Sequence, residues 1–268
     1  MRTKFWMAMF AVTAMANIAS AQTVTLLSED FDGAVVTYVT SLNDTDGDQF
    51  DYFRVTDGTD IGLTYNGSNG NYFAANDIDG VVGVVDLGIG GQGAARQTLR
   101  FNNIPIAGFQ NFQLSFDAAE AESNDGNEDW DAPDLVHASF VVDGNAPTGP
   151  SDGWALWFDN PEANSTNLPA FKNDDVTFGA DPVNGGFNGT GLPGDLVTDT
   201  FQTFTGPVLP FTGTTADLVL TFDLNSGDED FAIDNIVLTA DTISVVPEPS
   251  SLALLGLVGC VGFIRRRR

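Results

Sequence analysis

The sequence is poor in cysteine, histidine and basic residues. Among 268 residues it has one Cys, one His and 10 Lys and Arg, against 37 Asp and Glu. A single Cys excludes an internal disulfide, and a single His excludes a metal site built from several histidines. The formal net charge of −27 excludes nucleic acid as a natural partner, because phosphate binding requires Lys or Arg. A hydrophobic fraction of 43% with 21 Phe is enough to build a core, so a wholly disordered acidic chain is not expected.

Residues 1–21 have the pattern of a secretory signal peptide. Arg2 and Lys4 precede an apolar stretch from residue 5 to residue 18, and Ala19-Ser20-Ala21 forms a small-x-small cleavage site before Gln22. As an uncleaved helix, this apolar stretch would reach only ~21 Å, less than the ~30 Å of a bilayer core. We therefore expect the export machinery to carry the chain through the inner membrane, and the mature chain to begin at Gln22.

Residues 247–268 carry three features in a fixed order. The triplet Pro247-Glu248-Pro249 comes first, a short apolar helix is expected over 252–264, and four arginines occupy 265–268. The prolines end any helix that approaches from the domain, and the arginines hold the far end on the cytoplasmic side of a membrane. This order resembles the PEP-CTERM sorting tail of Gram-negative bacteria. The resemblance implies a transient membrane anchor, a membrane-embedded exosortase that processes the tail, and delivery to the cell surface or the extracellular space, often alongside exopolysaccharide.

Residues 22–246 are predicted to form one domain, because no linker or second core is visible in the sequence. This segment holds four basic residues and 36 acidic ones, a net charge of −32. A surface of this charge repels itself at low salt and requires counter-cations.

Short stretches of alternating apolar and polar residues recur through this domain, and no long stretch has a helical period. Gly, Asp and Asn turn signals lie between them. We therefore predict an all-β fold, a two-sheet antiparallel jelly-roll-like sandwich of about eleven strands. The longest irregular region, about 160–196, is interpreted as a loop that could border a ligand site. The expected strands cover 24–27, 35–39, 72–75, 98–101, 112–116, 136–142, 154–158, 201–204, 218–224 and 231–238.

The block from residue 71 to residue 238 resembles the jelly-roll modules of secreted bacterial proteins, which are related in shape to carbohydrate-binding and MAM-like sandwiches. The motifs that carry the resemblance lie at strand ends and turns, within 71–80, 114–117 and 225–236. The resemblance implies that the last strand pairs near the first strand, 24–31. The acidic residues at 29, 30 and 32 would then lie close to those at 230 and 234.

Several carboxylates held close together are unfavourable unless they are protonated or bridged by a cation. Oxygen ligands and the absence of thiols favour Ca²⁺ over zinc, so the sequence suggests a structural Ca²⁺ site. Asp44, Asp46 and Asp48 resemble the start of a calcium loop, but position 55, where a Glu belongs, is Val. The alternative is that these acids form a solvated surface suited to a saline habitat. The candidate ligands are Glu29, Asp77, Asp79, Asp230 and Asp234.

Two tryptophans are candidates for sugar binding. An exposed aromatic ring presents an apolar face on which a sugar ring can stack. Trp130 lies in an acidic loop, and Trp157 points away from the apolar face of its own strand. The alternative for Trp157 is that the 160–196 loop covers it.

Three features that could indicate an enzyme are weak. Gly88 to Gly93 match the dinucleotide pattern G-x-G-x-x-G, but no βαβ unit surrounds them. His137 lies in an expected strand, and the chain has no G-x-S-x-G motif. Glycoside hydrolysis needs a pair of carboxylates, but in a chain with so many acids the presence of such a pair does not indicate a glycosidase. We therefore predict no enzymatic activity.

Three functions stay open at this point. The first is an exported, non-catalytic protein of the cell surface or extracellular matrix that binds carbohydrate. The second is a purely structural acidic surface protein that Ca²⁺ bridges to its surroundings. The third, a secreted hydrolase, is the least favoured.

Overall fold

The computed structural model describes residues 21–41, 52–76, 78, 97–121, 135–145, 154–159, 170–171, 197–224 and 229–243. For residues 135, 154–159 and 170–171 it describes the backbone alone. Within the chain, Thr23–Thr242 form one compact unit, and the two ends, Met1–Gln22 and Ile243–Arg268, are grouped apart from it. No helix in the described ranges is long and apolar enough to cross a membrane. The predicted helix at 252–264 lies outside the described residues.

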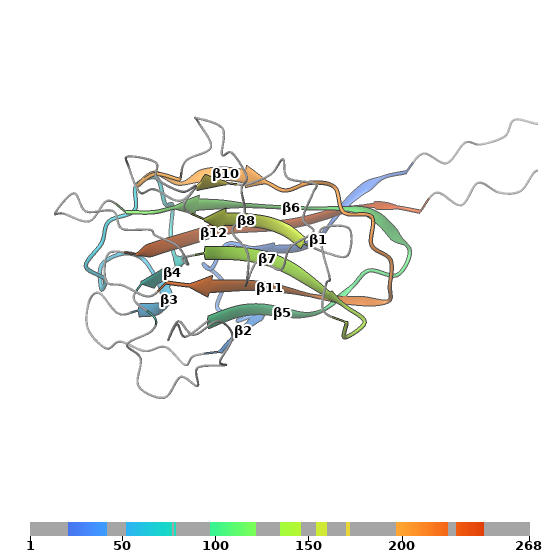
Figure 1. Ribbon diagram of the computed structural model, residues 1–268, viewed down its shortest axis with the longest axis horizontal. Coiled ribbons are helices and arrows are strands. Elements are labelled where there is room, and N and C mark those ends of the chain that lie inside the picture. The colour runs from blue at the N-terminus through green and yellow to red at the C-terminus, as the bar shows by residue number, and fades with distance from the viewer. Residues whose placement is uncertain are drawn as a thin grey trace, which may run out of the picture. The chain divides into compact units, whose positions relative to one another are not determined.

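The described chain is all β-strand in two antiparallel sheets, which confirms the predicted sandwich. The first sheet has the order β10-β6-β12-β4-β3, with β1 also paired to β12, and the second has the order β2-β5-β11-β7-β8-β9. Strands of both sheets run in roughly similar directions (Figure 1), as expected for aligned sheet packing. The strands are β1 (Thr23–Glu29), β2 (Tyr38–Thr40), β3 (Tyr52–Thr56), β4 (Tyr72–Asn76), β5 (Gln97–Pro105), β6 (Phe109–Ala119), β7 (Leu135–Val142), β8 (Trp154–Asp159), β9 (Ala170–Phe171), β10 (Gln202–Thr205), β11 (Thr215–Asp223) and β12 (Asp230–Thr242).

The core lies between the two sheets and is rich in phenylalanine. On β11, Leu218, Leu220 and Phe222 are fully buried, while Val219 between them is half-buried. This is the period-2 pattern that predicted the strand. Phe222 meets Phe53 and Phe73 of the other sheet, with ring centroids 5.4 and 5.8 Å apart. These inter-sheet ring contacts hold the two layers together, because large aromatic side chains dominate core energetics.

Strand β12 is central in the first sheet. One of its edges pairs with β6, and its other edge pairs with β4 along residues 230–233 and with β1 along residues 236–241. The expected pairing of the last strand with the first is therefore confirmed. The ends of β1 and β4 meet beside a register shift of β12 between Asp234 and Val237, where Asn235 has a positive φ of 49°. A residue in the left-handed region at a register shift is typical of a β-bulge.

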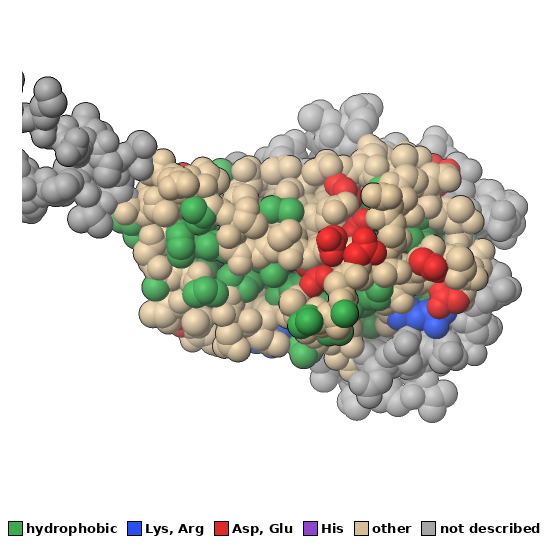
Figure 2. All heavy atoms as spheres, turned by 180° about the vertical axis from the view of Figure 1, so that it is seen from behind, with side chains coloured by type: hydrophobic (Ala, Val, Ile, Leu, Met, Phe, Trp, Pro, Cys, Tyr) green, Lys and Arg blue, Asp and Glu red, His purple; other side chains and the backbone are tan. Residues whose placement is uncertain are grey.

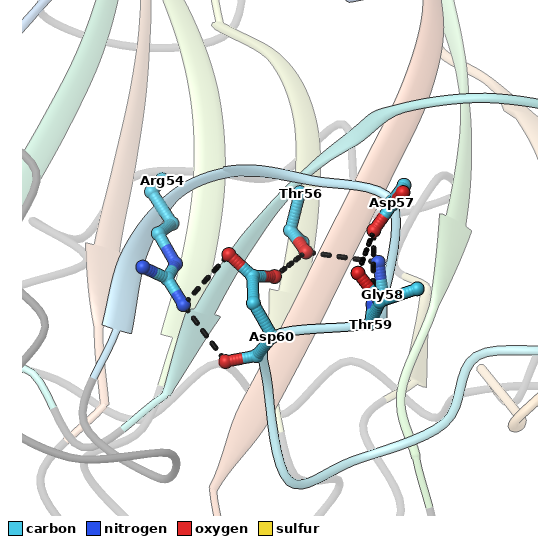
Figure 3. A network of polar contacts seen from close by, with 6 residues as sticks. All are labelled: Arg54, Thr56, Asp57, Gly58, Thr59 and Asp60. Carbon is cyan, nitrogen blue, oxygen red and sulfur yellow. Dashed lines mark hydrogen bonds and ion pairs between the residues drawn. The ribbon is translucent and has the colours of Figure 1, made fainter.

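A second, smaller apolar cluster lies on the outer face of the first sheet. Tyr52, Tyr72 and Ala232 of the sheet are covered by Ile61, Leu63 and Tyr65, which lie between β3 and β4. Arg54 fixes this covering segment, because its Nη2 forms an ion pair with Asp60 Oδ2 at 3.0 Å and donates to the Asp60 carbonyl at 2.9 Å (Figure 3). Thr56 and Asp57 add hydrogen bonds to the same turn.

Candidate functional site

The outer face of the first sheet carries a group of acidic side chains at the place where β1 and β4 meet beside β12. We call Asp30, Asp32, Asp117 and Asp234 the acidic face. Asp30 and Asp32 follow β1, Asp117 lies on β6, and Asp234 lies opposite Asp117 in the β12–β6 register. Figure 2 shows Asp and Glu side chains gathered on this side of the molecule. Carboxylates from three separate segments thus come together on one surface.

Glu29 fixes the turn that carries Asp30 and Asp32. Its side chain is buried, its Oε1 accepts the Phe31 N–H at 3.0 Å, and its Oε2 accepts the Thr37 hydroxyl. Phe31 has a positive φ of 56° and packs its buried ring against Phe73 at 6.0 Å. The strained backbone at Phe31 is therefore held by a hydrogen bond on one side and by core packing on the other.

Asp32 joins this turn to the start of β4. Its Oδ1 accepts the Asn71 N–H at 2.8 Å, and the Asn71 side-chain amide donates to the Phe31 carbonyl at 3.5 Å. Gly70 has a φ of +120°, and a Cβ atom placed there would lie 2.4 Å from both carboxylate oxygens of Asp32. Glycine is required at position 70, because the backbone conformation and the close approach of Asp32 both exclude a side chain.

Asn235 lies between two carboxylates of the acidic face. Its side-chain amide donates to Asp117 Oδ2 at 2.9 Å and to Asp234 Oδ2 at 3.2 Å, and its backbone N–H donates to Asp234 Oδ1 at 2.7 Å. The hydroxyl of Thr203 donates to Asp117 Oδ1 at 2.5 Å. The bulge thus supplies neutral donors to carboxylates that would otherwise only repel each other.

The acidic face is electrostatically strained. The pKa of Asp234 is raised to about 6, first by burial and then by the charges of Asp117, Asp32 and Asp30, against the hydrogen bond from the Asn235 backbone. None of these four carboxylates forms an ion pair with a Lys or Arg of the described residues. The two arginines in that part of the chain form ion pairs with other acids, Arg54 with Asp60 and Arg100 with Asp217. A cation at this face would relieve the repulsion.

Asp230 lies elsewhere, although it shares β12 with Asp234. It is buried beneath the covering segment, its Oδ1 accepts the Ala121 N–H at 2.8 Å, and Tyr65 forms a side-chain hydrogen bond with it. Burial raises the pKa of Asp230 to about 7, against these two hydrogen bonds. The Tyr52 and Tyr65 hydroxyls are 3.0 Å apart, and burial raises the pKa of both. Asp230 therefore belongs to a buried network with tyrosines and not to the acidic face.

The remaining predicted site residues fall mostly outside the described part of the chain. Asp77, Asp79 and Trp130 lie there, as do the sorting residues at 247–249. For Trp157 the backbone is described, and it pairs with His137 in the β7–β8 register.

The structure brings Asp234 together with Asp30 and Asp32, the juxtaposition expected from pairing of the first and last strands. The sequence did not predict Asn235 and Asn71, whose N–H groups donate to the carboxylates of this face. An Asp-Asn pair inside a strand is the signal that could have marked the bulge, because Asn tolerates a positive φ.

The described residues do not form a closed metal cage. Among them, no three His, Cys, Asp or Glu side chains are grouped so that they could hold a metal ion. On the acidic face, both oxygens of Asp117 and of Asp234 already accept hydrogen bonds, from Asn235 and, at Asp117 Oδ1, from Thr203. Any cation there would therefore take few protein ligands and complete its coordination from elsewhere.

Comparison with known proteins identifies the tail. Residues 245–268 match the family model described as the PEP-CTERM protein-sorting motif, which confirms the resemblance seen in the sequence. This motif indicates export of the chain and sorting by an exosortase. No curated protein matches the chain.

Solved structures similar to this chain are β-rich domains of several kinds. The K3 cleaved adhesin domain of Lys-gingipain from Porphyromonas gingivalis w83 is 13% identical, with 81% of this chain and 99% of that one covered and a TM-score of 0.36. The CBM22-1 xylan-binding domain of Paenibacillus barcinonensis Xyn10C is 10% identical, with 84% and 99% covered and a TM-score of 0.38. A cyclase from Fischerella sp. TAU is 12% identical, with 82% and 98% covered and a TM-score of 0.41. At these identities and TM-scores, none of the three bears on the function of this chain.

Proposed function

We propose that this chain is an exported, non-catalytic protein of the cell surface or extracellular matrix, which holds Ca²⁺ at its acidic face and through it contacts acidic polysaccharide. The observation that carries the export and sorting is the match of residues 245–268 to the PEP-CTERM sorting motif. The sandwich would then be the part that is displayed, and an exosortase its processing partner.

The absence of catalysis is supported by the chemistry available. The sequence offers one imidazole, His137, and its only thiol, Cys260, lies in the sorting tail. On the acidic face, neutral amides hold Asp117 and Asp234 in place. A carboxylate that acts as a general acid or base must be able to exchange a proton with a bound substrate, and these two carboxylates are engaged with amides of the protein instead.

The calcium proposal rests on the electrostatics of the acidic face together with a net charge of −32 over residues 22–246. Ca²⁺ takes six to eight oxygen ligands in proteins. Because the described residues hold no closed cage, most positions around an ion at this face would go to water or to polysaccharide oxygens. The same ion can then bridge two negatively charged partners that would repel each other at low salt.

Thermal unfolding of residues 22–246 at increasing Ca²⁺ concentrations tests the calcium proposal. Extracellular calcium modules bind in the ~0.1–1 mM range, so Ca²⁺ in this range should raise the melting temperature by mass action. NaCl or Mg²⁺ at equal ionic strength is the control, because screening of the acids also stabilises the fold. In the double variant Asp117→Asn/Asp234→Asn, the rise in melting temperature that is specific to Ca²⁺ should disappear. In Asp57→Asn, which removes an exposed carboxylate in a turn away from β12, this rise should remain. A Ca²⁺ effect no larger than the control, or equal in all variants, refutes the site.

A glycan array, run with Ca²⁺ and with chelator, separates this proposal from direct sugar binding. Binding to acidic glycans that requires Ca²⁺ and is indifferent to Trp157→Ala supports bridging. Binding that survives chelator and disappears in Trp157→Ala supports instead an aromatic platform at Trp130 and Trp157. No binding to any glycan contradicts polysaccharide contact and leaves a purely structural role.

A further inference from the structure

The end of the sandwich at which the chain enters and leaves the fold carries few charged side chains among the described residues. We call the described residues 23–25, 104–112, 141–145, 206–216 and 239–243 the tail end. Thr23 at the start of β1 pairs with Asp241 near the end of β12, and Thr242 pairs with Phe109 at the start of β6. A tight turn joins β5 to β6, and the Phe109 N–H donates to the Ile106 carbonyl at 3.2 Å. The starts and ends of strands from both sheets therefore meet at this end.

The described tail end has two acidic residues, and both are engaged locally. Asp143 accepts hydrogen bonds from Thr214 and Thr215, at distances from 2.6 to 3.2 Å. Asp241 accepts from Thr23 at 2.6 Å and from Asn111 at 3.0 Å. These hydrogen bonds lower the pKa of both carboxyls. The exposed side chains around them are neutral, and Val208 is 54% exposed.

Apart from Asp143, Asp241 and Asp217, which is ion-paired with Arg100, the acidic side chains of the described surface gather away from the tail end. The acidic face begins where β1 ends, and Asp57 and Asp60 lie in the turn that follows β3 (Figure 3). Figure 2 shows Asp and Glu side chains concentrated on one half of the drawn surface, while hydrophobic and neutral side chains dominate the other half. The described domain is thus polarised along its strands.

The sorting tail is joined to this end by a short connection. Strand β12 ends at Thr242, and the apolar segment begins at residue 252, so nine residues lie between them, two of which are prolines. Fully extended, such a connection spans at most ~30 Å. While the tail is in a bilayer, the domain cannot leave the neighbourhood of the membrane surface.

We propose that the tail end faces the anionic lipid surface while the tail is anchored, with the acidic face turned away from it. This rests on insertion of the sorting tail, as in the proposed function. Repulsion between carboxylates and anionic headgroups acts within a Debye length, ~8 Å at physiological salt. The orientation that places the two carboxylates of the tail end at the lipid, and the four carboxylates of the acidic face away from it, therefore has a lower electrostatic energy than the reverse orientation. It also leaves the acidic face open to Ca²⁺ and polysaccharide.

A quenching experiment on residues 22–268 tests the orientation. In a Cys260→Ser background, one fluorophore is attached at Ala107→Cys, in the exposed β5–β6 turn, or at Ala34→Cys, exposed beside the acidic face. Both chains are placed in vesicles that contain anionic lipid and lipid with a nitroxide headgroup, and flotation reports tail insertion separately. We expect strong quenching at position 107 and weak quenching at position 34. Equal quenching at the two positions, or stronger quenching at position 34, overturns the proposal.

A charge variant tests the physical cause. Val208→Asp should reduce the population of molecules whose tail end faces the membrane about fivefold. This factor corresponds to the ~1 kcal/mol that one charge contributes near an anionic surface. The effect should disappear in zwitterionic vesicles, and the matched variant Val35→Asp, a substitution at another exposed valine, should have none. An equal effect of Val208→Asp on both vesicle types contradicts the electrostatic cause. A chain that does not float with vesicles removes the anchoring premise and thereby overturns the proposal too.

Discussion

The buried carboxyl of Asp230 should make the stability of this domain fall as the pH rises from acidic to neutral. Asp230 is 1% exposed, and burial raises its pKa from 3.8 to about 7. A raised pKa means that the folded state binds the proton more tightly than the unfolded state. The stabilisation from this proton is therefore complete below the unfolded pKa of 3.8 and is lost progressively until the pH passes about 7.

The magnitude follows from the size of this shift. One pKa unit corresponds to 1.36 kcal/mol, so a shift of about three units amounts to about 4 kcal/mol of unfolding free energy. Asp230→Asn is the matching perturbation, because Asn has no proton to lose. Its side-chain oxygen can still accept the Ala121 N–H, and its amide can donate to Tyr65. The variant should match the wild type at pH 4 and be more stable than it at pH 8, by up to about 4 kcal/mol.

Urea unfolding at the two pH values, in high salt to screen the surface acids, measures this difference. The comparison of variant with wild type cancels the ionisation of all other groups, including Asp234. If the free energies of unfolding of the two proteins change by equal amounts between pH 4 and pH 8, Asp230 does not hold its proton in the folded state and the reasoning is refuted.

Three further substitutions test other parts of the structure, each by urea unfolding. Gly70→Ala should destabilise the fold by about 1–3 kcal/mol, because of the positive φ and the contact with Asp32. Gly144→Ala is the control, because this exposed glycine also has a positive φ but an added Cβ would meet nothing. Equal losses of stability in the two variants would contradict the role of the contact. Phe73→Ala should cost about 3–5 kcal/mol, because it empties a fully buried position between the sheets; a loss below 1 kcal/mol would mean that the core is not packed as described. Arg54→Met should cost about 1 kcal/mol through loss of the ion pair with Asp60, whose side chain is half-exposed, and no loss would show that the covering segment does not depend on this ion pair.

The strand pattern was predictable wherever one face of a strand is buried and the other is wet. Alternation located β11 and β12 because their outward residues are partly exposed or polar. Strand β3 was missed because the covering segment buries its outer face too, so Tyr52 and Phe53 are both buried and no alternation remains. Strand β4 is buried on both faces as well, and it was predicted only as a short apolar run, 72–75. Strand β9 has two residues, too few for any pattern. In the expected strand 35–39, Val35 and Val36 are instead exposed and precede β2.

The acidic face was predictable in part, because it depends on strand pairing. Pairing of the first and last strands was enough to place Asp30 and Asp32 near Asp234. The separation of Asp230 from Asp234 could not be foreseen, because both point to the same face of β12 and only the covering segment distinguishes them. The part played by Asn235 depends on a bulge, and a bulge shifts the register in a way that periodicity does not encode.

Mass spectrometry of both termini of the native protein, purified from the cell envelope and the medium, tests the central claim of export and sorting most directly. We expect a mature N-terminus at Gln22, produced by cleavage after Ala21, and a C-terminus near Pro247 with the apolar segment and arginines removed. Envelope-localised or secreted protein with an intact Met1 or an intact Arg268 would contradict it.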